Sequence, residues 1–179
     1  MSLFDSLFEP KRIALIGASS DEKRTTSRPQ RFLQKHGFRG EILPVNPGRA
    51  EVFGVKAYKA IDAVPGDIDH AYILLNGKDA VAALEACGRR GVKVASILAG
   101  GFADAGAAGA SLQDELVRIV EQTGIRLVGP NSIGTVSTDP PMALTANAAF
   151  AVDRLRPGKW AVVSQSGRCS APRSFGQRR

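Results

Sequence analysis

The chain has 179 residues, enough for one domain with a substantial core, and 44% hydrophobic with 23% charged residues is typical of a soluble globular protein. No apolar run approaches the length of a membrane span, and the first residues lack the basic and apolar regions of a signal peptide. The net charge of +7 favours an anionic ligand, either a polyphosphate or a nucleic acid.

The pattern of apolar residues predicts strands that alternate with helices. In chain order we expect a strand at 12–16, a helix at 29–35, strands at 41–45 and 71–75, a helix at 79–89, a strand at 92–98, a helix at 112–121 and a strand at 125–128. Glycines 37, 91 and 124 are the expected helix stops. This alternation predicts right-handed βαβ units, and therefore an α/β fold with a Rossmann-like parallel sheet and helices on both faces.

Small residues follow the predicted strands. These loops lie at 17–20, 46–49, 76–78, 99–102 and 129–132, and four of them place glycine beside a small or amide side chain. Because parallel sheets bind ligands beyond the carboxyl ends of their strands, we expect a crevice there. The first loop, Gly17-Ala18-Ser19-Ser20, is small enough for backbone N–H groups to reach a phosphate. Taken alone, this loop is equally explained as an ordinary turn.

The basic residues fall into two groups. Residues 168–179 contain four arginines and no acid. The other group follows the first loop and consists of Lys23, Arg24, Arg28, Arg31, Lys35 and Arg39. Only 6% of the chain is aromatic, so a stacking platform for nucleic acid is not evident, and we do not expect a nucleic-acid partner. A polyphosphate ligand or a solvated helix face explains the second group.

Familiar motifs of nucleotide chemistry are missing. A dinucleotide fingerprint requires G-x-G-x-x-G after the first strand and an acid after the second, but the first loop has one glycine and the second strand ends in Asn46-Pro47. Walker A and nucleophile-elbow motifs are also absent. His36 and His70 lack metal-ligand spacing, and two cysteines are too few for a disulfide scaffold or a Cys-ligated site. We therefore predict no catalytic residue, no metal and a reducing, cytoplasmic location.

Four segments together resemble a known family. They are 16–19 (Ile-Gly-Ala-Ser), 45–47 (Val-Asn-Pro), 99–104 (Ala-Gly-Gly-Phe-Ala-Asp) and 129–132 (Gly-Pro-Asn-Ser). Their order and spacing resemble the CoA-binding domain of the NDP-forming acyl-CoA synthetases, which include the ADP-forming acetate–CoA ligases. That domain is similar to the α subunit of succinyl-CoA synthetase. The resemblance covers about residues 8–167.

The resemblance implies that CoA lies across the strand ends. The first loop would meet CoA through backbone N–H groups and small side chains, and the Arg49 guanidinium suits a phosphate. Residues 98–100 would line the pantetheine side, and residues 131–132 would lie near the thiol end. The implied CoA-binding residues are Gly17, Ser19, Ser20, Asp21, Glu22, Pro47, Arg49, Leu98, Ala99, Gly100, Asn131 and Ser132.

Three departures from the family pattern stand out. Ser132 replaces a commoner Cys, and Leu75-Asn76-Gly77 replaces Val-Pro-Ala, where Asn76 suits a helix cap. Asp21 and Glu22 would repel CoA phosphates unless their side chains face solvent. We hypothesise that Arg28 and Arg31 supply the compensating charge.

The resemblance also predicts the domain organisation. Residues 1–150 would form the CoA-binding domain, 151–167 would begin a truncated second domain, and 168–179 would be a basic, disordered tail. Pro172 opposes a helix there, so we expect a frameshifted or truncated reading of a longer protein, the alternative being a genuine basic tail for an acidic partner.

In the family, phosphate passes through a phosphohistidine of the second domain, and the nucleotide binds a further ATP-grasp domain. Neither His36 nor His70 matches the phosphohistidine. We therefore expect a module that binds CoA or acyl-CoA and needs the remaining ligase domains, for example on another chain, for chemistry. An apolar edge exposed by truncation would favour homodimers. An NAD(P)-binding regulatory or redox module is the alternative.

Overall fold

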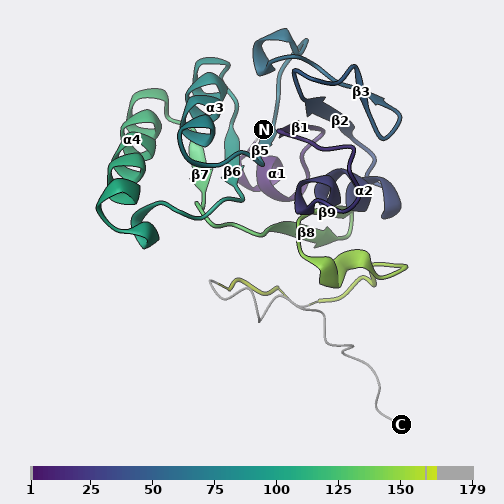
Figure 1. The fold of residues 1–179 in the computed structure, drawn as a ribbon. Helices are drawn as coiled ribbons and strands as arrows, with labels where there is room; N and C mark the ends of the chain where they lie inside the picture. Colours follow the sequence, from purple (N-terminus) through teal and green to yellow (C-terminus); the bar gives the residue numbers. More distant parts are fainter. Residues whose placement is uncertain (1, 160, 165–179) are drawn as a thin grey trace.

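The computed structural model describes residues 2–159 and 161–164 (Figure 1). Its centre is a five-stranded parallel sheet in the order β2-β1-β5-β6-β7. The strands are β1 (Arg12–Ile16), β2 (Glu41–Val45), β5 (His70–Ile73), β6 (Val94–Ile97) and β7 (Arg126–Val128). The predicted Rossmann-like parallel sheet is confirmed. Strand order reverses between β1 and β5, which is where ligands bind in sheets of this kind.

Three helices connect the sheet strands. They are α2 (Arg28–Lys35), α3 (Gly77–Arg89) and α4 (Ala107–Thr123), and a short α1 (Leu3–Phe8) precedes β1. Single turns of 3-10 helix lie at η1 (Thr25–Ser27), η2 (Ile61–Ala63), η3 (Ala103–Ala105) and η4 (Ala148–Ala151). Helix α4 begins five residues before the predicted Leu112, because its alanine-rich first turn carries no apolar period. Gly124 ends it in the left-handed region, as expected.

Alternate residues of each strand face opposite sides of the sheet. On one side, Ala14, Ile16 and Ile73 pack with residues of α3 and α4, which lie side by side in Figure 1. On the other side, Leu15 and Tyr72 pack in a second, separate cluster. Both faces are therefore buried, which explains why the strands read as continuous apolar runs.

A hairpin completes the second face. Strands β8 (Gly134–Thr138) and β9 (Pro141–Thr145) pair antiparallel, and Met142 and Leu144 of β9 join the cluster that contains Leu33 of α2. Gly134 has φ +117°, and a Cβ there would overlap the Leu144 carbonyl. This hairpin and the small pair β3 (Glu51–Val52) and β4 (Val55–Lys56) were not predicted. The second face is thus covered by α2 together with β-structure.

Basic side chains of α2 and its C-terminal end hold the segment after β9. Arg28 Nη1 donates to the Ala146 carbonyl at 3.1 Å, and Lys35 Nζ donates to the Ala151 carbonyl at 2.7 Å. His36 Nε2 lies 2.9 Å from the Phe150 carbonyl. The predicted domain boundary at 150 falls within η4, and the predicted tail at 168–179 lies outside the described residues.

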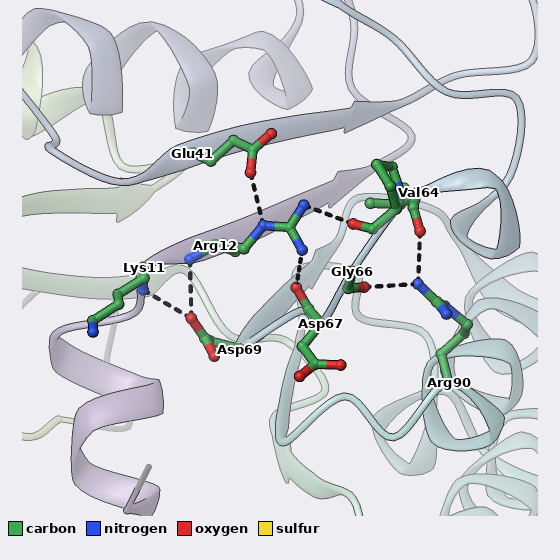
Figure 2. Close-up of polar contacts among 9 residues, drawn as sticks. Lys11, Arg12, Glu41, Val64, Gly66, Asp67, Asp69 and Arg90 are labelled. Atoms are coloured by element: carbon green, nitrogen blue, oxygen red, sulfur yellow. Dashed lines mark hydrogen bonds and ion pairs between the residues drawn. The ribbon is translucent and has the colours of Figure 1, made fainter.

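The amino-terminal edge of the sheet is fixed by Arg12 (Figure 2). Its Nε donates to Glu41 of the neighbouring strand at 2.7 Å, Nη2 donates to the Pro65 carbonyl at 2.7 Å, and Nη1 donates to the Asp67 carbonyl. Nearby, Arg90 donates to the carbonyls of Val64 and Gly66 at 2.6 and 2.9 Å. These two arginines fasten the loop before β5 to the sheet.

Candidate ligand site at the carboxyl edge of the sheet

The loops after β1 and β2 are joined by the side chain of Asn46. Its Nδ2 donates to the Ala18 carbonyl at 2.8 Å, and its Oδ1 accepts from the backbone N–H of Gly48 at 2.8 Å. The N–H of Gly17 donates to the Val45 carbonyl at 2.9 Å, which aligns the two strand ends. One amide side chain therefore fixes both loops at the place where the dinucleotide fingerprint would require an acid.

Gly17 is required by both conformation and space. Its φ is +86°, in the region that favours glycine, and a Cβ there would lie 2.7 Å from Cδ2 of Leu75. Leu75 follows β5, so the first loop packs directly against the next strand end at the point where strand order reverses. In the structure Gly17 therefore allows the close approach of two loops, while its predicted contact with CoA stays a prediction.

A pocket of about 300 Å³ opens beside these loops. It is lined by Ser19, Ser20, Asp21, Arg24, Asn46 and Arg49. Four of these residues belong to the predicted site, whereas Gly17, Glu22 and Pro47 do not line the pocket. Arg24 and Asn46 were not among the predicted site residues. Arg24 carried only a weak signal, as one member of a basic cluster that had several explanations.

The acids of the first loop are paired with arginines. Asp21 accepts from the backbone N–H of Lys23 at 3.0 Å and lies 3.7 Å from Nε of Arg24. Glu22 lies 3.4 Å from Nη2 of Arg31, so the expected compensation of this acid is present. The hypothesis for Arg28 does not match the structure, because its guanidinium points to the Ala146 carbonyl. Arg24, and not Arg28, is the second arginine that pairs with an acid of the first loop.

A second group of predicted residues meets at the ends of β6 and β7. The N–H of Asn131 donates to the Ala99 carbonyl at 2.8 Å, and the N–H of Ser132 donates to the Ile97 carbonyl at 2.9 Å. A Cβ on Gly100 would lie 3.7 Å from Cγ of Asn131, so the two residues are neighbours. Asn131 has φ +58°, a conformation that asparagine tolerates better than most residues.

Two further residues shape this second group. Leu98 donates its N–H to the Ile73 carbonyl at 3.0 Å and packs against the second core cluster. Asp104 accepts hydrogen bonds from the N–H groups of Gly101 and Phe102, and these bonds hold the pKa of its carboxyl below the usual value. The loop after β6 is therefore closed on itself by a charged carboxylate.

Tyr72 links the second group to the core. It lies in the middle of β5, it is fully buried, and its Oη donates to the Ser132 carbonyl at 3.0 Å. Burial raises the pKa of its hydroxyl, which therefore stays protonated and remains a donor at physiological pH. A side chain from the middle of the sheet therefore fixes the position of the loop that carries Asn131 and Ser132.

The two groups lie on one edge of the sheet but at different strands. The pocket lies at β1 and β2, and the Gly100–Asn131 pair lies at β6 and β7, with β5 in between. Neighbouring strands are about 4.8 Å apart, so β1 and β6 are separated by roughly 10 Å. A ligand that touches both groups must therefore be long and extended.

Unlike Tyr72, the buried titratable side chains of His70 and Cys87 lie away from this edge. His70 begins β5 and pairs with Oγ of Ser96 at 2.8 Å, and Cys87 is a free thiol in α3 whose burial raises its pKa to about 12. Within residues 2–159 and 161–164 no group of three His, Cys, Asp or Glu side chains is placed to hold a metal ion. No helix in the described part of the chain is both long and apolar enough to cross a membrane.

The comparison with family models decides the relationship. Residues 11–138 match the model of the CoA binding domain family. The chain belongs to this family. The matched CoA-binding domain contains both loop groups and all twelve predicted site residues.

Relatives of this CoA-binding domain are longer proteins. The chain is 37% identical over 171 residues to the α subunit of an ADP-forming acetate–CoA ligase I of Pyrococcus furiosus, and this match covers 93% of the chain and 36% of the subunit. It is 34% identical over 161 residues to an ADP-forming 4-hydroxybutyrate–CoA ligase of Nitrosopumilus maritimus, covering 90% of the chain and 23% of the ligase. The chain thus spans about a third or less of these relatives' lengths.

A solved structure shows the same fold. The acetyl-coenzyme A synthetase 1 of Ca. Korarchaeum cryptofilum, in its apo form, is 34% identical, with a TM-score of 0.76 over 80% of this chain and 31% of that one. The resemblance seen in the sequence motifs is therefore confirmed in both family and fold.

Proposed function

We propose that this chain binds CoA in an extended form along the carboxyl edge of its sheet, as the CoA-binding module of an NDP-forming acid–CoA ligase. The nucleotide end would occupy the polar pocket at β1 and β2, where two arginines and two serines gather. The pantetheine arm would cross above β5 towards Ala99 and Gly100, and the thiol end would lie near Asn131 and Ser132.

One observation carries this proposal. A charged, polar pocket and a pair of close-packed small loops lie on the same sheet edge, separated by the width of the strands between them. CoA has a matching polarity, with phosphates at one end and a slender, uncharged arm at the other. Family membership and the ligase relatives support the same ligand.

An NAD(P)-binding module is less well supported. NAD-binding domains of this architecture use an acid after the second strand to bind the ribose hydroxyls. Here the residue is Asn46, and both ends of its side-chain amide already bond to the backbone. The ribose hydroxyls of NAD would therefore lack their usual carboxylate partner.

Ligase chemistry would require domains beyond this module. The relatives are several times longer, and in the described structure the two histidines serve packing, with His70 in the core and His36 against the Phe150 carbonyl. We propose that partner domains, on this or another chain, supply the phosphate-transfer groups, and that the module itself works in the cytoplasm without a metal.

Calorimetric titration of the chain tests the proposal. We expect saturable binding of CoA and acetyl-CoA, with a rise in the thermal midpoint because a ligand that binds only the folded state stabilises it. NAD and NADP should bind at least tenfold more weakly. Tighter binding of NAD than of CoA, or no binding of CoA at millimolar concentration, would contradict the proposal.

A further inference from the structure

We propose that helix α1 and the groove beside it form an interface between two copies of this chain. This surface, the α1 face, combines exposed apolar side chains, an apolar groove and two charged side chains, and its central residues are Leu3, Phe4, Phe8, Glu9 and Arg39. The α1 face lies at the amino-terminal edge of the sheet, where β1 and β2 begin. The candidate ligand site is at the opposite edge, so the inference is independent of the proposed function.

The first argument concerns the orientation of α1. The helix carries its apolar residues at 3, 4, 7 and 8, the spacing of an apolar stripe along one side of a helix. The first turn of this stripe faces outwards, with Leu3 51% and Phe4 61% exposed, whereas Ser6 is fully buried. The Ser6 hydroxyl donates to the Ser2 carbonyl at 3.2 Å, so its inward position leaves no donor unsatisfied. A capped helix that exposes its apolar side indicates a protein contact.

The second argument is that α1 holds this stripe in a fixed position. Oγ of Ser2 accepts from the N–H of Asp5 at 3.1 Å, and the Asp5 carboxylate accepts from the N–H of Ser2 at 2.8 Å. The rings of Phe4 and Phe8 lie 5.0 Å apart, and the helix packs against β6 and β8 (Figure 1). The exposed side chains are therefore presented by an ordered element.

The third argument concerns the groove that continues the stripe. It has a volume of about 670 Å³ and lies between the end of α1, the turn before β2 and the β8–β9 hairpin. Its apolar wall consists of Phe8, Phe38, Pro140, Pro141 and Met142. Phe8 belongs to both the stripe and the groove, so a projecting and a recessed apolar surface adjoin on one face. An aromatic side chain such as Phe4 gains much of its binding energy in a recess of this kind.

Charge favours a second copy as the occupant. Glu9 and Arg39 line the groove and are exposed, and neither takes part in an ion pair among residues 2–159 and 161–164. Glu41 of the same groove is already bound to Arg12. A two-fold contact sets one surface against itself, so each feature must find its complement on that surface. In such a pair Phe4 enters the groove of the second copy, and Glu9 faces Arg39 of the partner subunit.

Sedimentation velocity of the full chain between about 1 and 200 µM tests the interface, and we expect a dimer with a Kd below about 100 µM. Phe4→Ser should raise this Kd about tenfold or more, because an aromatic anchor is lost. Val117→Ser is the matched control, since Val117 is 46% exposed on α4, and it should leave the Kd within about twofold. Circular dichroism checks that both variants are folded.

A charge exchange tests the two-fold arrangement. Glu9→Arg and Arg39→Glu should each raise the Kd about three- to tenfold, because each homodimer then contains two like-charged pairs. An equimolar mixture of these two variants restores both opposite-charge pairs, so it should form heterodimers as tightly as the unmodified chain. A chain that stays monomeric at 200 µM, or a dimer that Phe4→Ser leaves intact, overturns the inference. A mixture that associates no better than its components overturns it as well.

Discussion

The two edges of the central sheet use arginine in opposite ways. At the amino-terminal edge, the side chain of Arg12 is 23% exposed, and its donors are bound to Glu41 and to backbone carbonyls of the loop before β5 (Figure 2). At the carboxyl edge, Arg24 is mostly exposed and has one weak carboxylate partner. The difference teaches that the partners of an arginine, and not its charge, separate a structural role from the ligand-binding role proposed for the carboxyl edge.

Arg12→Ala gives the sharpest test of this contrast and the largest expected effect. The substitution leaves three acceptors without their donor, so the free energy of unfolding should fall by about 2–3 kcal/mol. Urea denaturation measures the loss. Below the unfolding transition, CoA affinity should stay within about twofold of the unmodified chain. Arg49→Ala should show the reverse pattern, and a common effect of both substitutions on affinity would break the contrast.

The amino-terminal edge should also make stability depend on pH. Burial lowers the pKa of His70 from 6.5 to about 4, because the charged imidazolium is excluded from the core. The unfolded chain therefore binds more protons between pH 6.5 and 4, so stability is complete above pH 6.5 and falls as pH is lowered through this window. The loss between pH 7 and 5 should be roughly 2 kcal/mol.

Urea denaturation at a series of pH values measures this dependence. His70→Gln keeps a polar side chain towards Ser96 but does not titrate, so the dependence between pH 7 and 5 should flatten in this variant. His36→Gln is the matched control at the rim of α2, and it should keep the dependence due to His70. If the free energy of unfolding of His70→Gln falls with pH as steeply as that of the unmodified chain, groups other than His70 cause the acid sensitivity.

Arg28 provides an intermediate case and the smallest expected effect. It donates one hydrogen bond to the Ala146 carbonyl and does not line the pocket. Arg28→Ala should therefore lower the free energy of unfolding by about 1 kcal/mol and change CoA affinity by less than twofold. A fivefold loss of CoA affinity would restore the original hypothesis that Arg28 compensates the acids of the first loop.

The sequence predicted the sheet well because both of its faces are buried. The continuous apolar runs at 13–16 and 42–45 predict strands β1 and β2, and the glycines after α2, α3 and α4 mark where these helices end. The β8–β9 hairpin was not predicted because its local sequence pattern is weak. Strand β8 is only half-buried, and the close approach of Gly134 to Leu144 depends on the folded structure. The local sequence does not show which distant part of the backbone will lie in close contact with a glycine.

The candidate site was predictable in part for a similar reason. Loops after strand ends are set by local sequence, which is why Ser19, Ser20 and Arg49 line the pocket and Asn131 meets Ala99 as expected, while their contact with a ligand stays a prediction. Which acceptor each basic side chain after the first loop contacts depends on where α2 and the segment after β9 lie in the fold. The exchange of roles between Arg24 and Arg28 therefore became visible only in the folded chain.

The hydrogen bond from Tyr72 to the Ser132 carbonyl has a consequence for the evolution of this domain. Tyr72 lies in the strand between the two loop groups, yet its hydrogen bond holds only the group that contains Ser132. A substitution at this core position during evolution would shift the loop at the ends of β6 and β7 and leave the pocket at β1 and β2 in place. The two halves of the candidate site can thus change separately, one of them from within the sheet.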